Sequence, residues 1–260
     1  KDYSFLSIMN TKEFKNGVLS ATLGSLWWGV IGTYFFQFIT FVGTLEVVVH
    51  RCIWTTFILL ITTLIFKKWY LVKENLINKK NIFILFITSI LIFGNWTAWI
   101  YAVATNRIID ASYGYFIFPI LTVFFDYLFL KEKLNKKRIL SILIVIGSSI
   151  YLAFNLSMFP WIGLLVAILW ATYNLLRKLI NIETDIGLLI ESLFILPLAI
   201  IVFYFIYQKG MNDFSLSNPK VMFFLFLAGP MTVIPLFLFI KGVEKCGLSA
   251  SGMIFFITPT

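Results

Sequence analysis

Long apolar runs, each long enough to cross a lipid bilayer, recur along this sequence from residue 16 to its end. A helix that spans the hydrocarbon core needs roughly 20 mostly apolar residues. Only 13% of the residues are charged and 60% are hydrophobic, whereas soluble domains carry about 25% charged residues. The sequence therefore predicts an all-α membrane protein with about nine transmembrane helices. We expect these helices at 16–38, 45–66, 81–104, 110–130, 138–155, 160–178, 185–207, 219–240 and from 248 onward.

Lysine and arginine residues are concentrated in alternate connections between these runs. The connections after the first, third, fifth and seventh runs contain only Arg107 and Lys209. Cytoplasmic loops carry an excess of Lys and Arg, so we place the amino terminus and the other connections in the cytoplasm. Because the charges follow the loops, the net charge of +9 does not indicate a face that binds nucleic acid. The basic segments contain Lys12, Lys15, Lys67, Lys68, Lys73, Lys79, Lys80, Lys131, Lys133, Lys136, Lys137, Arg138, Arg177, Lys178, Lys241 and Lys245.

A short pattern occurs twice, five predicted helices apart. Residues 111–119 read ASYGYFIFP, and residues 250–259 read ASGMIFFITP. A unit with an odd number of helices, repeated once, gives two copies of opposite orientation, which is a common design of secondary transporters. The pattern predicts a ten-helix bundle of two inverted five-helix repeats, with about nine helices in this sequence.

The predicted repeats divide the chain into three parts. Residues 1–15 form a cytoplasmic segment, residues 16–156 the first repeat, and residues 157–260 a second repeat that stops within the ninth helix. Met9 opens a plausible native start, so we interpret residues 1–8 as lying upstream of it. A tenth helix is expected beyond the last residue.

Eight groups of residues, spread over nearly the whole chain from Met9, form a further pattern. They are Glu46 with His50, Arg51 and Trp54; Asn95-Trp96; residues 111–119; Leu130-Lys131-Glu132; Pro160-Trp161; Tyr173 with Leu176-Arg177-Lys178; Glu191; and Pro259-Thr260. Together they resemble the EamA domains of the drug/metabolite transporter superfamily, and most closely the RarD branch. The resemblance implies a ten-helix permease of the bacterial inner (plasma) membrane without a defined substrate. The family pattern has an asparagine where this chain has Phe118, so that polar position is absent here.

Ionisable side chains near the start of the second predicted helix form a candidate gating patch. Glu46 lies at the interface, and His50 is one turn, about 6 Å, deeper on the same face. His50 can change charge near neutral pH, and Trp54 extends this face. Arg51 points elsewhere and is expected to snorkel outward. The alternative for Glu46 and Arg51 is an interface anchor that orients the helix.

Glu191 and Asn95 are candidate binding residues deeper in the spans. Glu191 lies about 9–10 Å into the seventh helix, where a carboxylate should pair with a cation or be protonated, as a proton or substrate-amine site. Its alternative role is a structural hydrogen bond between helices. Asn95, next to Trp96, could equally bind a substrate or join two helices.

Aromatic and polar groups away from the helix ends complete the candidate set. A cavity lined with aromatic rings suits amphipathic or cationic solutes, although packing is the commoner role of a single ring. Pro119 interrupts a helix and is a candidate hinge. The remaining candidate substrate-binding residues are Trp99, Tyr113, Tyr115, Trp170, Tyr173 and Asn174.

These features favour a secondary transporter, not an enzyme, that moves a small organic solute such as an amino acid, metabolite or drug by alternating access. The sequence has no phosphate-binding glycine loop, no metal-ligand cluster and no cofactor motif. The lipid bilayer and a small-molecule substrate are the expected partners, nucleic acid is not, and a homodimer is a further candidate. Two alternatives stay open, a membrane-embedded scaffold or sensor and a lipid-modifying membrane enzyme.

Overall fold

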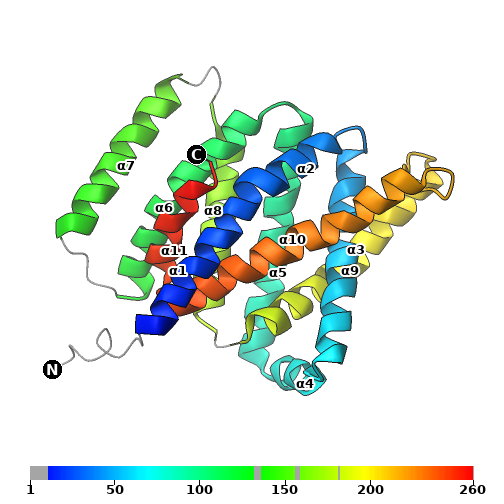
Figure 1. The fold of residues 1–260 in the computed structure, drawn as a ribbon, viewed down its shortest axis with the longest axis horizontal. Helices are drawn as coiled ribbons and strands as arrows, with labels where there is room; N and C mark the ends of the chain where they lie inside the picture. Colours follow the sequence, from blue (N-terminus) through cyan, green and yellow to red (C-terminus); the bar gives the residue numbers. More distant parts are fainter. Residues whose placement is uncertain (1–10, 132–135, 156–158, 181, 260) are drawn as a thin grey trace.

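The computed structural model describes residues 11–131, 136–155, 159–180 and 182–259, and all regular structure in these ranges is helical. The structure thus confirms the all-α class, and Figure 1 shows the arrangement of the helices. The elements are α1 (Thr11–Leu26), η1 (Trp27–Gly32), α2 (Thr33–Phe38), α3 (Thr44–Ile65), α4 (Trp69–Ile77), α5 (Lys79–Ala104), α6 (Ile108–Phe129), α7 (Lys136–Asn155), α8 (Trp161–Lys178), α9 (Thr184–Gln208), α10 (Pro219–Cys246), α11 (Leu248–Ile254) and η2 (Phe255–Ile257).

Each of the nine predicted runs is helical where the structure describes it, but two details differ from the sequence prediction. The first run, Thr11–Phe38, is continuous and contains a π-helical segment, η1, in its middle. The connection after α3 is not an open loop, because it forms the short helix α4. Within the described residues, six helices are long and apolar enough to cross a membrane, so the chain is a multi-pass membrane protein.

The sequence fixes several helix ends through local hydrogen bonds. Asn78 precedes α5, and its side chain accepts hydrogen bonds from the backbone N–H groups of Lys80 and Asn81, as a helix N-cap does. Asn218 caps α10 in the same way. Gly247 has a φ of +89°, a conformation that suits glycine. It allows the chain to turn directly from α10 into α11.

The helix contacts come in pairs. α1 packs against α10 and α5 against α8; α3 packs against α10 and α5 against α9; α3 contacts α9 and α6 contacts α11. The expected repeat pairs α1 with α8, α3 with α9, α5 with α10 and α6 with α11. Exchanging the members of each pair turns the α1–α10 contact into α8–α5 and the α3–α10 contact into α9–α5, and it leaves the α3–α9 and α6–α11 contacts unchanged. α7 lies at the edge of the bundle, where it contacts α6 (Figure 1).

Glycines allow the closest helix contacts. A Cβ atom added to Gly114 of α6 would collide with the carbonyl of Gly163 in α8, and one on Gly163 would collide with the carbonyl of Asp110. Gly242 of α10 faces Ala21 of α1, where an added Cβ would lie 2.7 Å from the Ala21 Cβ. Small residues at such positions let helix backbones approach within a membrane.

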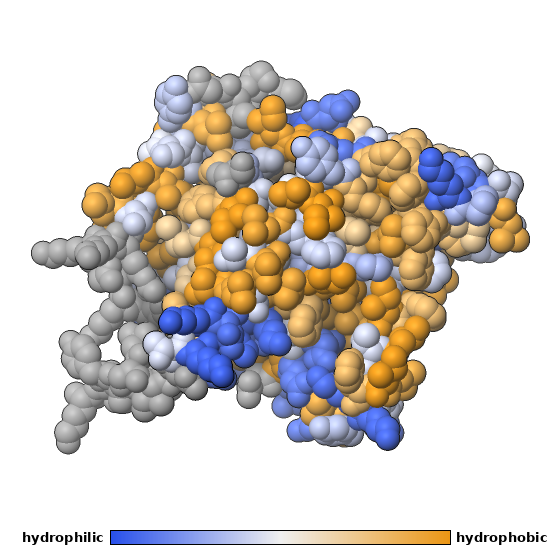
Figure 2. All heavy atoms as spheres, in the orientation of Figure 1, coloured by the Kyte–Doolittle hydropathy of each residue, from blue (hydrophilic) through white to orange (hydrophobic). Residues whose placement is uncertain are grey.

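The two ends of the bundle differ in charge. The lysine-rich end comprises the starts of α1, α5 and α9 with α4 and the ends of α3, α8 and α10; the lysine-poor end comprises the ends of α2, α5 and α9 with the starts of α3, α6, α8 and α10. Figure 2 shows an apolar band across the molecule with hydrophilic side chains along its lower edge. This edge corresponds to the lysine-rich end.

Candidate functional site

A cavity of about 170 Å³ lies between η1, α2, α3, α5, α6, α8 and the segment from η2 to Pro259. It extends toward the lysine-poor end, because its wall includes the half-buried residues Thr33, Trp99, Ile108 and Ser112 near helix termini at that end. Aromatic rings and small polar groups alternate on the wall. The lining residues are Trp28, Gly29, Gly32, Thr33, Phe36, Arg51, Asn95, Trp96, Trp99, Ile108, Ser112, Tyr115, Trp170, Phe255, Thr258 and Pro259.

The π segment η1 shapes one wall of this cavity. Such segments occur frequently at functional sites because they displace side chains from the regular helical spacing. The Thr33 hydroxyl donates a hydrogen bond to the Trp28 carbonyl at 2.9 Å. Gly29 allows close approach of the segment after α11, since a Cβ there would lie 2.6 Å from the Thr258 carbonyl oxygen.

Arg51 is buried in the bundle, so the expectation that it snorkels outward is wrong. Its side chain leaves α3 on the side that faces α2, α5 and α10 and is buried between them. Its Nε donates to the Thr232 hydroxyl at 3.0 Å, and its guanidinium carbon lies 4.5 Å from the centre of the Phe36 ring and 4.9 Å from that of Trp96. Aromatic faces attract a cation in this position.

Asn95 makes the helix contact that was one of its two expected roles, and it also lies on the cavity wall. Its side-chain amide donates to the Val166 carbonyl of α8 at 3.1 Å, and the residue also lines the cavity. The hydrogen bond holds α5 against α8. The same side chain is therefore both a helix contact and part of the cavity wall.

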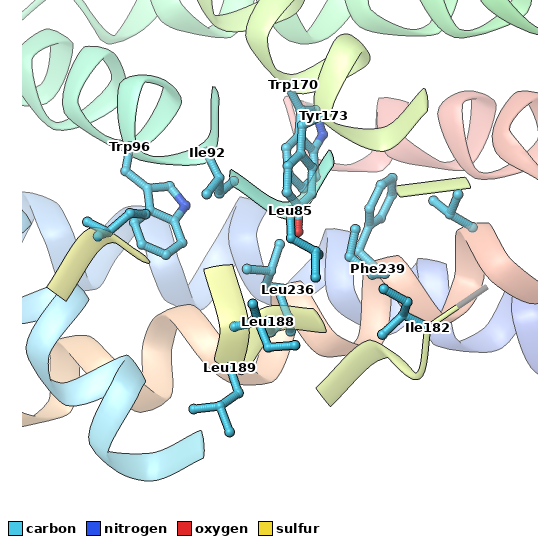
Figure 3. Close-up of a cluster of buried hydrophobic side chains, with 14 of the residues drawn as sticks. Leu85, Ile92, Trp96, Trp170, Tyr173, Ile182, Leu188, Leu189, Leu236 and Phe239 are labelled. Carbon is cyan, nitrogen blue, oxygen red and sulfur yellow. The ribbon is translucent and has the colours of Figure 1, made fainter. Parts of the chain in front are cut away.

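Aromatic rings close the cavity toward the lysine-rich end. Trp170 stacks on Tyr173 at 5.3 Å between ring centres, and Phe118 meets Phe255 at 4.9 Å. Phe239 packs against both Trp170 and Phe255. Figure 3 shows Trp170, Tyr173 and Phe239 among the buried side chains of this region. Phe118 thus belongs to a layer of rings beneath the cavity. We call this layer the aromatic floor; it consists of Phe118, Trp170, Tyr173, Phe239 and Phe255.

Glu191 lies on the far side of this floor and does not line the cavity. Its carboxylate accepts hydrogen bonds from the Thr88 hydroxyl at 2.6 Å and the Tyr173 hydroxyl at 3.1 Å, and Arg177 Nε lies 3.7 Å away. The four residues come from α5, α8 and α9 and are fully or nearly buried. Pairing with a cation is one of the states expected for a carboxylate at this depth.

Glu46 and His50 form a contact at the lysine-poor end. The Glu46 carboxylate accepts hydrogen bonds from the backbone N–H groups of Asp213 at 2.8 Å and Phe214 at 2.9 Å, in the α9–α10 connection. His50 lies 3.8 Å from Glu46 and packs against the rings of Phe203 and Phe214. We call the Glu46 hydrogen bonds to residues 213–214 the outer latch.

A second contact joins the corresponding segments at the lysine-rich end. The Lys68 amine, between α3 and α4, donates to the carboxylates of Glu183 at 2.6 Å and Asp185 at 2.8 Å, at the start of α9. Burial lowers the pKa of Lys68, but the hydrogen bonds to Asp185 and Glu183 outweigh it, and the net pKa is raised. The amine therefore stays protonated. We call this contact the inner latch.

Asp126 is fully buried near the end of α6. Its carboxylate accepts hydrogen bonds from the backbone N–H of Ser249 at 2.6 Å and from the Ser249 hydroxyl. A carboxylate at the first turn of a helix is favourable. The contact ties the end of α6 to the start of α11. Glu132, which belongs to the family pattern, lies outside the described residues.

The structure brings six of the predicted site residues to the cavity. These are Arg51, Asn95, Trp96, Trp99, Tyr115 and Trp170. The others, Glu46, His50, Trp54, Tyr113, Pro119, Tyr173, Asn174 and Glu191, are not part of its wall.

Several lining residues were not on the predicted list of site residues. They are Trp28, Gly29, Gly32, Thr33, Phe36, Ile108, Ser112, Phe255, Thr258 and Pro259. Trp28, Gly29, Gly32 and Thr33 could have been found from the stretch WWGVIGT, residues 27–33, which places two tryptophans and two glycines in one apolar run.

Comparison with known proteins gives one family. A model of the EamA-like transporter family matches residues 15–154. Protein RarD of Escherichia coli (strain K12) is 31% identical over 252 residues, which cover 97% of this chain and 85% of that protein. The uncharacterized transporter YojE of Bacillus subtilis (strain 168) is 32% identical over 255 residues, with the same coverage. An uncharacterized transporter of Vibrio cholerae is 31% identical over 250 residues, or 96% of this chain and 82% of that protein.

Proposed function

Because the chain belongs to the EamA-like transporter family, in its RarD branch, we propose that this transporter moves a small organic solute across the bacterial inner membrane by alternating access. The observation that carries the proposal is the cavity between the two halves of the chain, which is lined by residues of both. A scaffold would not need such a space. The volume of about 170 Å³ favours a solute with a single ring or a short aliphatic chain.

The two latches support alternation between two open states. The outer latch joins the start of α3 to the α9–α10 connection, and the inner latch joins the start of α9 to the α3–α4 connection. These are corresponding positions in the two halves. In the structure the cavity extends toward the lysine-poor end, and the aromatic floor separates it from the lysine-rich end. Both latches are formed in this structure, so breaking one while the other stays intact would open access on one side of the membrane at a time.

A solute-exchange assay tests transport. Liposomes that contain the purified protein are loaded with a bacterial metabolite extract and diluted, and solute loss is measured by mass spectrometry. We expect protein-dependent loss of a small set of solutes. Ser112→Trp should block it because it fills the cavity, whereas Phe154→Trp should not, because Phe154 lies 86% exposed on α7. Equal loss from protein-free liposomes, or unchanged loss with Ser112→Trp, contradicts the proposal.

A further inference from the structure

Arg51 has unused hydrogen-bonding capacity at the cavity. A guanidinium has five N–H donors, and Arg51 uses only the one on Nε, for Thr232. Its two terminal amino groups have no hydrogen-bond partner among the described residues. The side chain is nevertheless 96% buried, since its residue is only 4% exposed. Four N–H donors are therefore held in place at the cavity wall, where Arg51 is a lining residue.

The positive charge of Arg51 also lacks a counter-charge. No aspartate or glutamate lies on the cavity wall, and no ion pair of Arg51 occurs in the described part of the chain. A buried cation within a span is costly unless it is paired. The rings of Phe36 and Trp96 offset part of this cost. Because the two rings do not supply a negative charge, the positive charge of Arg51 is not neutralised by the residues around the cavity.

We propose that the cavity binds a monocarboxylate with a compact apolar body, and that Arg51 is the group that binds the carboxylate. A carboxylate matches the fork of the guanidinium and forms two charge-assisted hydrogen bonds with it. This inference rests on the proposed function in one respect, which is that the bound ligand is the transported solute. It changes one expectation from the sequence, because an aromatic cavity with an unpaired arginine disfavours a cationic solute.

The rest of the wall suits the body of such a ligand. Trp28, Tyr115, Trp170 and Phe255 form the deeper, apolar part, where their rings contact one another. An engineered cavity of about 150 Å³ accepts benzene, so a volume of about 170 Å³ accommodates one ring. Ser112 and Thr33 place hydroxyl groups near the lysine-poor end. They provide polar contacts for a substituted ring.

Three probes of similar size and different charge test this assignment by binding alone. Phenylacetate is an anion, phenylacetamide is neutral and 2-phenylethylammonium is a cation. Binding of each to the purified protein in detergent is followed by quenching of tryptophan fluorescence, since Trp28, Trp96, Trp99 and Trp170 line the cavity. We expect phenylacetate to bind at least about tenfold more tightly than either other probe. Equal affinities, tighter binding of the cation or no saturable binding of phenylacetate overturn the assignment.

Variants then test whether Arg51 is the group that binds the carboxylate. Arg51→Gln should abolish the preference for the anion, and Arg51→Lys should keep part of it, because an ammonium supplies charge without the fork. Arg107→Gln is the matched control: it removes an arginine near the same end of the bundle that does not line the cavity. A preference that survives Arg51→Gln overturns the role of Arg51. The wild-type comparison stays decisive if that variant does not fold.

This binding test is independent of transport. If phenylacetate binds selectively and no solute crosses liposome membranes, the carboxylate site stands and the proposed transport fails. If other solutes are transported and the three probes bind equally, transport stands and the carboxylate site fails.

Discussion

Arg51 and Arg177 are both cations buried within helices of the bundle, and they differ in what surrounds them. Arg177 lies 3.7 Å from the carboxylate of Glu191, which also accepts hydrogen bonds from Thr88 and Tyr173. Arg51 lies against two aromatic rings without an acidic partner in the described residues. The first arginine is neutralised by the protein itself. The second is available to neutralise a ligand, and this difference separates a structural network from a binding site.

Replacing Glu191 should destabilise the protein. Glu191→Gln keeps an oxygen for Thr88 or Tyr173 but leaves Arg177 as an unpaired buried charge, which typically costs about 3–5 kcal/mol. We expect a clear decrease in the midpoint of thermal unfolding in detergent. Adding Arg177→Met to this variant should recover part of the loss. Glu74→Gln is the control on an exposed carboxylate, and a Glu191→Gln variant as stable as the wild type would show that the ion pair contributes little.

Proton coupling through Glu191 or His50 is a prediction from the position of these groups in the spans. Solute transport in liposomes should then respond to an imposed pH gradient, and Glu191→Gln or His50→Gln should remove that response. The readout is the ratio of initial rates with and without the gradient, which does not depend on how much protein folds. Transport that does not respond to the pH gradient, together with a fully active Glu191→Gln variant, would contradict proton coupling.

At the scale of elements, packing of α6 on α8 depends on two glycines in direct contact. An added Cβ at Gly114 or Gly163 would meet backbone atoms of the other helix, which cannot move aside as a flexible side chain does. The cavity lies beside this contact, because Ser112 and Tyr115 come from α6 and Trp170 comes from α8. Separation of the two helices would therefore change the width of the cavity.

Alanine substitutions test this contact. Gly114→Ala and Gly163→Ala should each lower stability by about 1–3 kcal/mol through overpacking, measured as thermal unfolding in detergent. Gly147→Ala on α7 is the control, because nothing lies within 4 Å of its added Cβ. There the substitution should be neutral or stabilising, since alanine favours a helix over glycine. A similar effect at all three positions would contradict the close packing of α6 on α8.

The two latches should be separable by hydrogen–deuterium exchange. Lys68→Met removes the inner latch, so amide exchange should increase at the α3–α4 connection and the start of α9 but not at residues 211–218. Glu46→Ala removes the outer latch and should give the reverse pattern. Increased exchange at both ends in either variant would mean that the two contacts are not independent.

The elements were largely predictable from the sequence, and the site was only partly so. Apolar length and alternating lysine clusters locate the spans, because the bilayer imposes both. The rotation of each helix depends on its neighbours, and the sequence contains no direct measure of it. Arg51 was therefore expected to reach the interface, whereas the structure buries it. The π segment η1 within the first run is likewise a local feature that apolar length does not indicate.

At the scale of the whole molecule, the distribution of charge and the pairing of helix contacts describe the same organisation. Lysines gather at one end of the bundle, and the contact of α1 with α10 is matched by that of α5 with α8. The charge asymmetry follows from orientation in the membrane, and two halves of opposite orientation would produce the paired contacts. The cavity lies between them, and its aromatic floor is built from both, with Phe118 in one half and Trp170 in the other.

Orientation in the membrane can be tested with single cysteines in a Cys52→Ala/Cys246→Ala background. Ser217→Cys lies in the lysine-poor α9–α10 connection, and Glu74→Cys lies in α4 at the lysine-rich end. We expect a membrane-impermeant maleimide to label the first in cells with a permeabilised outer membrane, and the second only after the inner membrane is opened. The opposite order would reverse the proposed topology.

Alternating access is the central claim, and labelling of a cysteine on the cavity wall tests it most directly. Ser112→Cys in the same background places a thiol on that wall. An impermeant maleimide is applied to right-side-out and to inside-out membrane vesicles, and labelling rates are compared with and without phenylacetate. The account predicts labelling from both sides, with rates that the ligand changes at each. Labelling from one side only, unaffected by any solute that the protein exchanges, would contradict it.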